Sequence, residues 1–188
     1  MSAEVLRQAF ASTGSILRNV SAEQLDLPTP CASWTVRDLV NHIVGGTTYF
    51  AVTAETGTGT APPVGDADHT AGDFKAEFEQ GAERAVKAFS ADGAMEKVMT
   101  LPFGELPGSI FVLVAANDTF THGWDLATAT GQPTDLDPAL AARLLEAAQF
   151  IPDEFRGPDG QAPFGPKVDV PEPASAADKL AGFMGRQI

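Results

Sequence analysis

The sequence has 188 residues, of which 44% are hydrophobic and 20% charged, and its formal net charge is −13. This composition is typical of one globular domain spanning residues 1–188 and excludes a disordered or membrane-embedded chain. With 25 acidic against 12 basic residues, the chain lacks the positive surface that nucleic acid or an anionic membrane requires.

Two helices are predicted in the first third of the chain. Apolar residues at helical spacing favour a helix over about residues 3–20. Two prolines within residues 28–30 end this pattern. A second helix begins at Ser33 or Thr35, and Thr35 with Asp38 resembles a capping box with Asp in place of Glu. The apolar stripe of this helix consists of Val36, Leu39, Val40, Ile43, Val44 and Thr47.

The middle of the chain alternates between loops and two further helices. Residues 56–73 are rich in Gly, Pro and Thr and predict a surface loop. A third helix is predicted over about residues 71–91, followed by 98–109 as a short hairpin or a single crossing strand. The fourth helix begins near Pro107 and ends at Gly131, because proline suits a helix start and glycine a helix end.

The last third of the chain predicts two shorter helices. One covers residues 137–151 and is entered through an Asp-Pro pair. The tail over 157–173 is predicted to be extended and irregular, and Ser175 caps a final short helix over 175–186. The expected fold is all-α, a bundle of four long helices with one or two short extra helices.

Targeting and redox features predict a cytoplasmic protein. Glu4 and Arg7 interrupt the N-terminal region, where a signal peptide would need an apolar run. The longest such run, 110–116, is far shorter than the roughly 20 residues of a membrane-spanning helix. Cys31 is the one cysteine, so no internal disulfide is available, and this fits a reducing compartment.

The fourth helix carries charged residues within an otherwise apolar sequence. Asp118 and His122 are four residues apart and therefore share one helix face, together with Asp125. A buried carboxylate and imidazole need compensation, which a divalent cation supplies. Helical bundles build metal sites from ligands at this spacing and a third ligand on a facing helix. His42, on the second helix, is the best third ligand.

The surroundings of His42 favour an open site. His42 lies at the border of its apolar stripe, beside Leu39, and Gly46 one turn further leaves space for water or a substrate. Three protein ligands leave one position free, as in catalytic zinc sites. Asp38 and Asp125 are candidates to accept hydrogen bonds from the imidazoles, or to act as a general base.

Simpler interpretations of the same residues stay open. Asp118 and His122 also suit an ordinary ion pair within a helix. Trp34 and Trp124 are candidate pocket walls or core residues. His69, in a polar loop, is interpreted as solvated and is excluded from the site.

Other chemistries have weaker support in the sequence. The N-terminus of a helix lowers the pKa of a nearby thiol, but Cys31 is interpreted as a small residue packed in the turn before Trp34. The chain contains no G-x-S-x-G, G-x-G-x-x-G or Walker-type sequence. A serine-hydrolase elbow and a nucleotide-phosphate loop are therefore not indicated.

Three segments together resemble a known family. "TPCASWTVRDLVNHIVGG" (29–46) and "NDTFTHGWDLATATGQ" (117–132) resemble the family that includes the metal-binding domain of mycothiol-dependent maleylpyruvate isomerase. That family belongs to the DinB-like group of metal-binding four-helix bundles. "FGPKVDVPEPASAADKLAGFMGR" (164–186) is similar to the ending of its stand-alone members. The resemblance covers nearly the whole chain.

The resemblance implies a metal site and a function. It implies that His42, Asp118 and His122 bind a divalent metal, zinc by ligand type, although nickel, iron and manganese accept similar donors. It also implies a small-molecule thiol such as mycothiol as cofactor or substrate, and a homodimer formed through helix faces. The isomerase has Glu where this chain has Asp118, and it has a separate C-terminal domain. Isomerase activity is therefore not expected here.

Three functions are consistent with the sequence. The first is a metal-dependent thiol transferase or related hydrolase. The second is a non-catalytic metal-binding or thiol-sensing module whose fourth ligand is Asp38 or Asp125. The third is a metal-free bundle that serves as an interaction scaffold.

Overall fold

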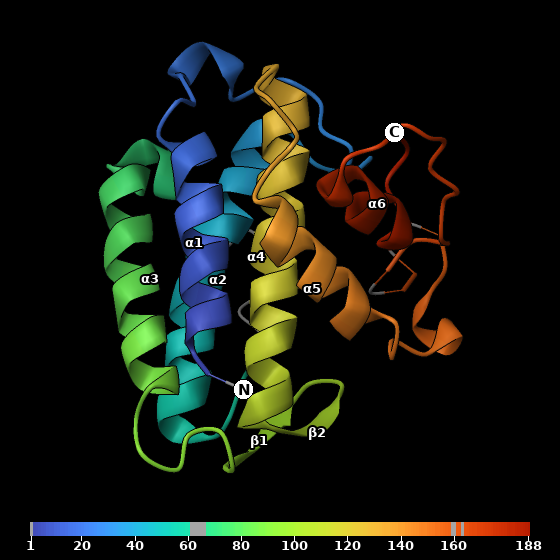
Figure 1. Cartoon of the computed structure of the whole chain (residues 1–188). Helices are drawn as coiled ribbons and strands as arrows, with labels where there is room; N and C mark the ends of the chain where they lie inside the picture. The colour runs from blue at the N-terminus through green and yellow to red at the C-terminus, as the bar shows by residue number, and fades with distance from the viewer. Residues whose placement is uncertain (1, 61–66, 159–160, 163) are drawn as a thin grey trace.

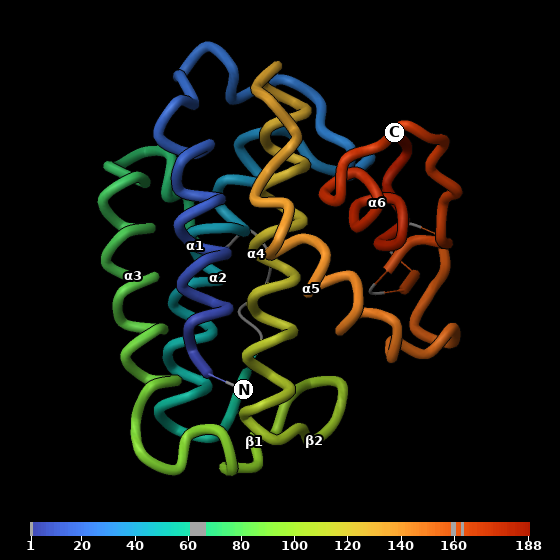
Figure 2. Tube along the Cα trace, viewed as in Figure 1, coloured from blue at the N-terminus to red at the C-terminus, as the bar shows by residue number. Residues whose placement is uncertain are grey.

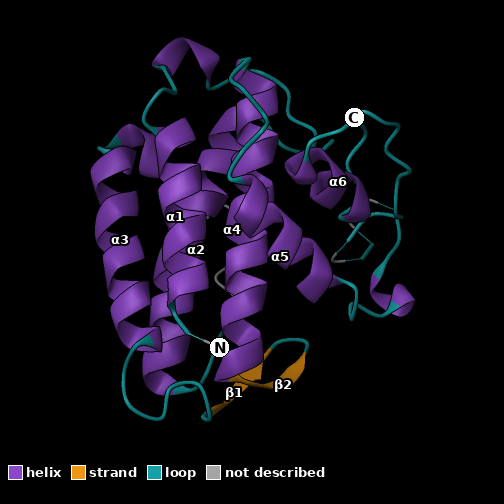
Figure 3. Ribbon diagram, in the orientation of Figure 1, coloured by secondary structure: helices purple, strands orange, loops and turns teal. Residues whose placement is uncertain are grey.

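The fold was taken from a computed structural model, which describes residues 2–60, 67–158, 161–162 and 164–188. Figure 3 shows that helices dominate the molecule and that one strand pair lies at one end. The α-helices are α1 (Glu4–Leu17), α2 (Val36–Thr56), α3 (Phe74–Phe89), α4 (Gly108–Thr130), α5 (Pro138–Ala148) and α6 (Ala176–Phe183). Short 3-10 helices are η1 (Ala22–Gln24), η2 (His69–Ala71) and η3 (Asp153–Phe155).

The helices α1 to α4 run side by side and form a four-helix bundle (Figure 1). Within it α1 packs most extensively on α4, and α2 on α3. α5 contacts α4 and α6, and α6 also contacts α4. The predicted all-α bundle with short additional helices is confirmed. Among the described residues, no helix combines the length and apolar character that a membrane crossing needs.

Local capping explains where the helices begin. At α2 the Thr35 hydroxyl accepts a hydrogen bond from the Asp38 backbone N–H, and the Asp38 carboxylate accepts one from the Thr35 N–H at 2.9 Å. Asp137 accepts hydrogen bonds from two backbone N–H groups at the start of α5. Ser175 and Asp178 form a second capping box at α6. These caps satisfy N–H groups that have no partner within the helix.

Residues 98–109 were predicted as a short hairpin or a single crossing strand, and the structure shows a hairpin. β1 (Val98–Leu101) and β2 (Gly104–Pro107) pair antiparallel, with Val98 opposite Pro107 and Leu101 opposite Gly104. Residues 98–109 therefore form a hairpin that leads directly into α4.

Both ends of each observed helix lie within about one helical turn of the predicted limits. α3 begins later than predicted, because Asp73 caps it and residues 69–71 form η2 instead. Within the predicted loop 56–73, residues 61–66 lie outside the described residues. Within the predicted tail 157–173, residues 159–160 and 163 do so as well.

The central helix of the bundle is α4. Every residue from Ala115 to Ala127 is buried except Asp118, which is partly exposed. A helix that is covered on nearly all sides must find a partner inside the protein for each polar side chain. His122 and Asp125 are therefore in surroundings where every contact affects stability.

Helix α4 approaches α1 closely at Gly123. A Cβ atom at this position would overlap the Thr13 hydroxyl and lie 3.1 Å from the Thr13 Cβ. Thr13 cannot easily turn away, because its hydroxyl donates a buried hydrogen bond of 2.8 Å to the Thr119 carbonyl. The glycine between His122 and Trp124 is thus required by helix packing.

We predict that Gly123→Ala lowers the free energy of unfolding by about 1–3 kcal/mol, the usual cost of overpacking a core. Urea denaturation followed by circular dichroism measures this change. Thr128→Ala, at an exposed position of the same helix, is the matched control and is expected to leave stability nearly unchanged. Equal stability of the two variants would contradict the prediction.

Candidate metal centre

Three side chains from α2 and α4 meet at the predicted metal site. The Nε2 atom of His42 lies 3.5 Å from Asp118 Oδ1, and Nε2 of His122 lies 3.7 Å from the same oxygen. One donor atom from each residue falls within 4.8 Å of the others. The imidazole rings of His42 and His122 lie edge to face at a centroid distance of 4.6 Å. The structure therefore brings together all three residues predicted as ligands.

The electrostatics of this cluster favour a cation. Burial raises the pKa of Asp118, but the neighbouring His42 and His122 outweigh burial and hold that pKa below its ordinary value. Burial likewise lowers the pKa of His42, and the Asp118 carboxylate reverses this and raises it overall. Asp118 is thus an anionic carboxylate between two imidazole nitrogens.

One nitrogen atom in the cluster lacks a hydrogen bond. His42 Nε2 is buried and, within the described part of the chain, makes no hydrogen bond; its contact with Asp118 Oδ1 at 3.5 Å is a long ion-pair contact. A buried polar atom without a partner is costly unless another group binds it. Two imidazole nitrogens and a carboxylate oxygen are donors that zinc and similar divalent metals prefer. The residues present therefore fit a divalent cation.

Asp125 lies on the far side of the His122 ring. Its side chain has 0% exposure, and Oδ2 lies 2.9 Å from His122 Nδ1. Burial raises the pKa of Asp125, but hydrogen bonds from His122 and Arg186 lower it to about 2. An ionised carboxylate only accepts hydrogen bonds, so Nδ1 of His122 carries the proton. The Nε2 atom of His122 lies on the other side of the ring, 3.7 Å from Asp118 Oδ1, so Asp125 is in the position from which a carboxylate can orient this imidazole.

Arg186 was not predicted from the sequence. Its Nε lies 3.0 Å from Asp125 Oδ1, and its Nη2 lies 2.8 Å from Oδ2. The pair is separated by 61 residues in the chain. No periodicity or motif connects residues so far apart, so sequence reasoning had no signal for this contact.

Cys31 also belongs to these surroundings. Its Sγ lies 3.4 Å from Asp125 Oδ2, 4.0 Å from His122 Nδ1 and 3.6 Å from Arg186 Nη2. The interpretation of Cys31 as a packed turn residue was incomplete. Figure 2 shows why: the loop before α2, in blue, runs up to the red C-terminal segment.

A second group of donors consists of Cys31, His122 and Asp125. The positive guanidinium of Arg186 already pairs with this carboxylate and approaches the sulfur atom. A second cation at the same place would be repelled. The cluster of His42, Asp118 and His122 is therefore the better candidate for a metal.

The two tryptophans have different positions. The Trp34 ring lies 4.8 Å from the His42 ring and 5.5 Å from the His122 ring, measured between centroids. Trp34 therefore covers one side of the candidate centre, as a pocket wall would. Trp124 is 3% exposed, and its Nε1 donates a 2.9 Å hydrogen bond to Asp178 on α6. Trp124 attaches α6 to α4 instead of lining the site.

Two other candidates are occupied elsewhere. The exposed Asp38 carboxylate accepts hydrogen bonds from the Thr35 N–H and hydroxyl, because a side chain at this place completes the helix cap. The Asp38 carboxylate therefore caps α2 and makes no hydrogen bond to an imidazole among the described residues. A Cβ at Gly46 would lie 3.5 Å from the Phe50 ring, so Phe50 takes part of the space predicted there.

His69 lies outside the candidate metal cluster, as predicted, but it is only partly solvated. Its Nδ1 lies 2.7 Å from Glu77 Oε2, and its side chain is only 22% exposed. η2 holds this ring against the side of α2, where it borders a cavity of about 290 Å³. The residues that line the cavity are Gly45, Thr48, Tyr49, Val52, Thr53, Thr58, Thr60 and His69.

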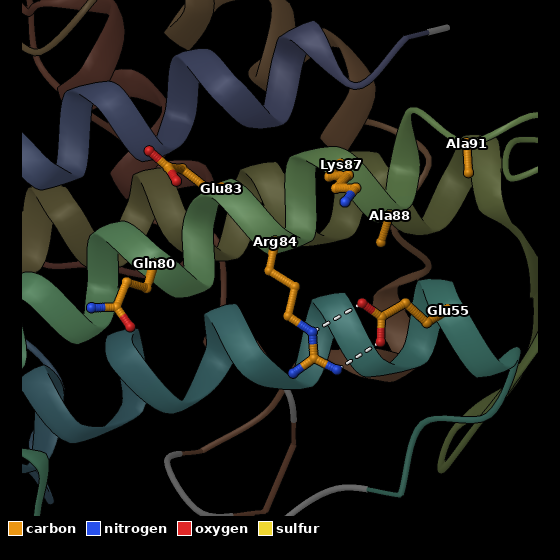
Figure 4. A pocket seen from close by; sticks show the side chains of 7 residues that line it. All are labelled: Glu55, Gln80, Glu83, Arg84, Lys87, Ala88 and Ala91. Atoms are coloured by element: carbon orange, nitrogen blue, oxygen red, sulfur yellow. Dashed lines mark hydrogen bonds and ion pairs between the residues drawn. The ribbon is translucent and has the colours of Figure 1, made fainter.

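A larger hollow of about 640 Å³ lies on the outer surface of α2 and α3. Figure 4 shows that Arg84 spans it and forms a two-point ion pair with Glu55. Its remaining lining residues are Gln80, Glu83, Lys87, Ala88 and Ala91. None of the lining residues is a histidine or cysteine, so this hollow is separate from the candidate metal centre.

Comparison with known proteins identifies the family. The mycothiol maleylpyruvate isomerase N-terminal domain family matches residues 6–127, which include the cluster of His42, Asp118 and His122. The chain belongs to this DinB-like family. Two uncharacterised proteins of Mycobacterium tuberculosis, from strains CDC 1551 / Oshkosh and H37Rv, are 40% identical to it over 183 residues. The alignment covers 97% of this chain and 94% of each relative.

Solved structures share the fold of this family member. Crystal structures of mycothiol-dependent maleylpyruvate isomerase and of a histidine-to-alanine mutant match with TM-scores of 0.53 and 0.54. Sequence identity is 15%, and the match covers 66% of this chain but 58% of the isomerase chain. The chain therefore corresponds to little more than half of the isomerase.

We predict that Asp125 makes folding stability depend on acid pH. Its pKa is about 2 in the folded protein and about 3.9 in an unfolded chain, so its contribution of about 2–3 kcal/mol is fully present above about pH 5. This contribution is lost as the pH falls towards 2. Urea unfolding at a series of pH values from 5 downward measures the loss.

Asp125→Asn is expected to flatten that pH dependence. It also lowers stability at neutral pH by about 3–5 kcal/mol, because Arg186 loses its buried partner. Asp26→Asn, whose carboxylate is 88% exposed, is the control and is expected to keep the wild-type slope. If Asp125→Asn kept that slope as well, Asp125 would not be its source.

Proposed function

We propose that this protein holds a divalent cation with His42, Asp118 and His122 and acts on a small-molecule thiol, as a metal-dependent thiol transferase or related hydrolase. One observation carries the proposal. The three side chains converge from two helices on a point where the buried Nε2 atom of His42 has no hydrogen-bond partner among the described residues. A cation is the group that satisfies this donor set.

Zinc is the first choice of metal, with nickel, iron or manganese as alternatives for the same donors. A cation bound here supplies Lewis-acid chemistry, which lowers the pKa of a thiol or water molecule that it binds. A carboxylate and two neutral imidazoles leave one positive charge of a divalent ion uncompensated. Such a site attracts an anionic ligand such as a thiolate.

The surrounding side chains support the site in separate ways. Asp125 accepts the Nδ1 proton of His122 and keeps Nε2 available. Trp34 packs against both imidazoles and restricts the access of water on that side. Asp118 provides the negative charge that offsets a buried cation.

Thiol chemistry has more support than hydrolysis. Asp125 is bound by His122 and Arg186, and Asp38 caps α2, so neither carboxylate is available as a general base. A metal-held thiolate needs no such base to become a nucleophile. Membership of a family named for a mycothiol-dependent isomerase favours a mycothiol-type thiol. The isomerase reaction itself is not proposed, because the chain matches only 58% of that enzyme.

The alternative is a non-catalytic metal-binding or thiol-sensing module. The position of Cys31, with Sγ 4.0 Å from His122 Nδ1, favours this alternative. Oxidation or modification of this sulfur atom would alter the surroundings of a proposed metal ligand. In that case the cation would be structural and its coordination closed. The cytoplasmic location and the homodimer both stay predictions.

We predict that the purified, untagged protein contains one divalent metal ion per chain. Removal of either imidazole, in His42→Ala or His122→Ala, is expected to reduce the metal content to near zero. Inductively coupled plasma mass spectrometry measures this content. His69→Ala is the matched control, because His69 pairs with Glu77 outside the cluster. A wild-type protein that stays metal-free after incubation with zinc, nickel, iron and manganese would refute the proposal.

A cobalt-substituted protein distinguishes catalysis from a structural site. We expect addition of a small thiol to produce a thiolate-to-cobalt charge-transfer band, because an open position accepts the sulfur atom. Cys31→Ser should give the same band, which shows that the signal does not arise from the protein's own thiol. Cobalt bound without any thiol-dependent band would instead support the closed, non-catalytic module.

A further inference from the structure

The buried pair of Asp125 and Arg186 connects the C-terminal segment to the candidate metal centre. The guanidinium contacts both carboxylate oxygens, with Nε 3.0 Å from Oδ1 and Nη2 2.8 Å from Oδ2. The third nitrogen, Nη1, donates to the Met184 carbonyl at 3.1 Å. Every nitrogen of this guanidinium therefore has a partner, and its orientation is fixed from two sides.

The backbone before Arg186 is held in one conformation. The Arg186 N–H donates to the Ala181 carbonyl, and the Gly185 N–H donates to the Gly182 carbonyl. Together with a φ of 95° at Gly185, these bonds form a Schellman motif at the end of α6. Arg186 occupies the last residue of that motif.

Close packing holds this motif against the tail. A Cβ atom at Gly185 would lie 2.5 Å from the Gly165 Cα, so the two glycine backbones are in direct contact. Val168 donates its N–H to the Gly182 carbonyl at 2.9 Å. The direction in which Arg186 leaves the helix is therefore determined by packing between α6 and residues 165–168.

We propose that Arg186 is a positioning residue for the metal centre: it fixes Asp125, and Asp125 in turn fixes the ring orientation and tautomer of His122. The inference rests on the proposed function and extends it to the C-terminal segment. The geometry forms a continuous path from Arg186 through Asp125 Oδ2 to His122 Nδ1, with Nε2 left facing Asp118. Arg186 lies outside the part of the chain that matches the family, residues 6–127.

Replacement of the guanidinium isolates its effect on the metal. In Arg186→Gln the carboxylate loses its two-point partner, and the dissociation constant for zinc is expected to rise 10- to 100-fold. Arg186→Lys keeps the charge but not the paired geometry, so an intermediate rise is expected. Gln187→Ala, at the exposed neighbouring residue, is the matched control with wild-type affinity. Competition with a zinc chelator measures all four proteins.

A second variant distinguishes positioning of Asp125 by Arg186 from a general attachment of α6 to α4. Asp178→Ala removes the hydrogen bond that Trp124 of α4 donates to α6, and also the carboxylate of the capping box that begins α6, but it leaves Arg186 in place. It is expected to lower the melting temperature without changing zinc affinity. If Asp178→Ala weakened zinc binding as much as Arg186→Gln does, Arg186 would act only by holding α6 in place, and the inference would be overturned.

The tautomer of His122 can be read in metal-free protein. Long-range ¹H–¹⁵N spectra of histidine-labelled protein, above the ordinary histidine pKa of about 6.5, distinguish Nδ1–H from Nε2–H. The chain has three histidines, so His42→Ala and His69→Ala assign the signals. Wild type is expected to show His122 as Nδ1–H, and Arg186→Gln a mixture of both tautomers. Arg186→Lys serves the same purpose if Arg186→Gln does not fold.

The two measurements fail independently. If no variant binds zinc, the proposed function is wrong, while the tautomer spectra still decide the role of Arg186. If the tautomer of His122 is unchanged in both Arg186 variants, the inference is wrong even when zinc binds.

Discussion

The structure depends on how one buried negative charge is neutralised. The side chain of Asp125 has no exposed surface and lies in the last third of α4, the most buried helix region described above. A carboxylate in such a place is tolerated only with a cation or several hydrogen bonds beside it. Arg186 supplies the positive charge and His122 a further hydrogen bond. The compensation of this charge thus requires contact between the bundle and the C-terminal segment.

The same contact relates stability to function. Asp125 faces the Nδ1 side of His122, and the proposed metal ligands lie on the Nε2 side of the same ring. Under the proposed function, the groups that compensate the buried charge also orient a metal ligand. Trp124 of α4 donates a hydrogen bond to Asp178 of α6, and Asp125 of α4 pairs with Arg186, which follows α6. The C-terminal segment therefore packs against the bundle next to the candidate metal centre.

The sequence predicted what depends on local rules. Helical periodicity and capping residues such as Thr35 identified the bundle, and spacing on α4 with the family resemblance identified the cluster around Asp118. Contacts made by loops and the tail follow no period, so the approach of Arg186 to Asp125 gave no signal. For Cys31 the sequence did contain a signal, because Cys31 and Trp34 belong to the same motif before α2. Of the two interpretations of Trp124, pocket wall or core residue, the structure supports the core residue, and its hydrogen bond to Asp178 on α6 could not be read from local spacing.

The long separation between the members of the ion pair has a consequence for protein synthesis. Arg186 follows Asp125 by 61 residues, so the ribosome produces the carboxylate roughly 3 to 12 s before the guanidinium, at 5–20 residues per second. During that interval the chain contains Asp125 but not yet the residue that pairs with it. The ion pair that compensates the buried charge of Asp125 can therefore form only after the C-terminal segment has been synthesised.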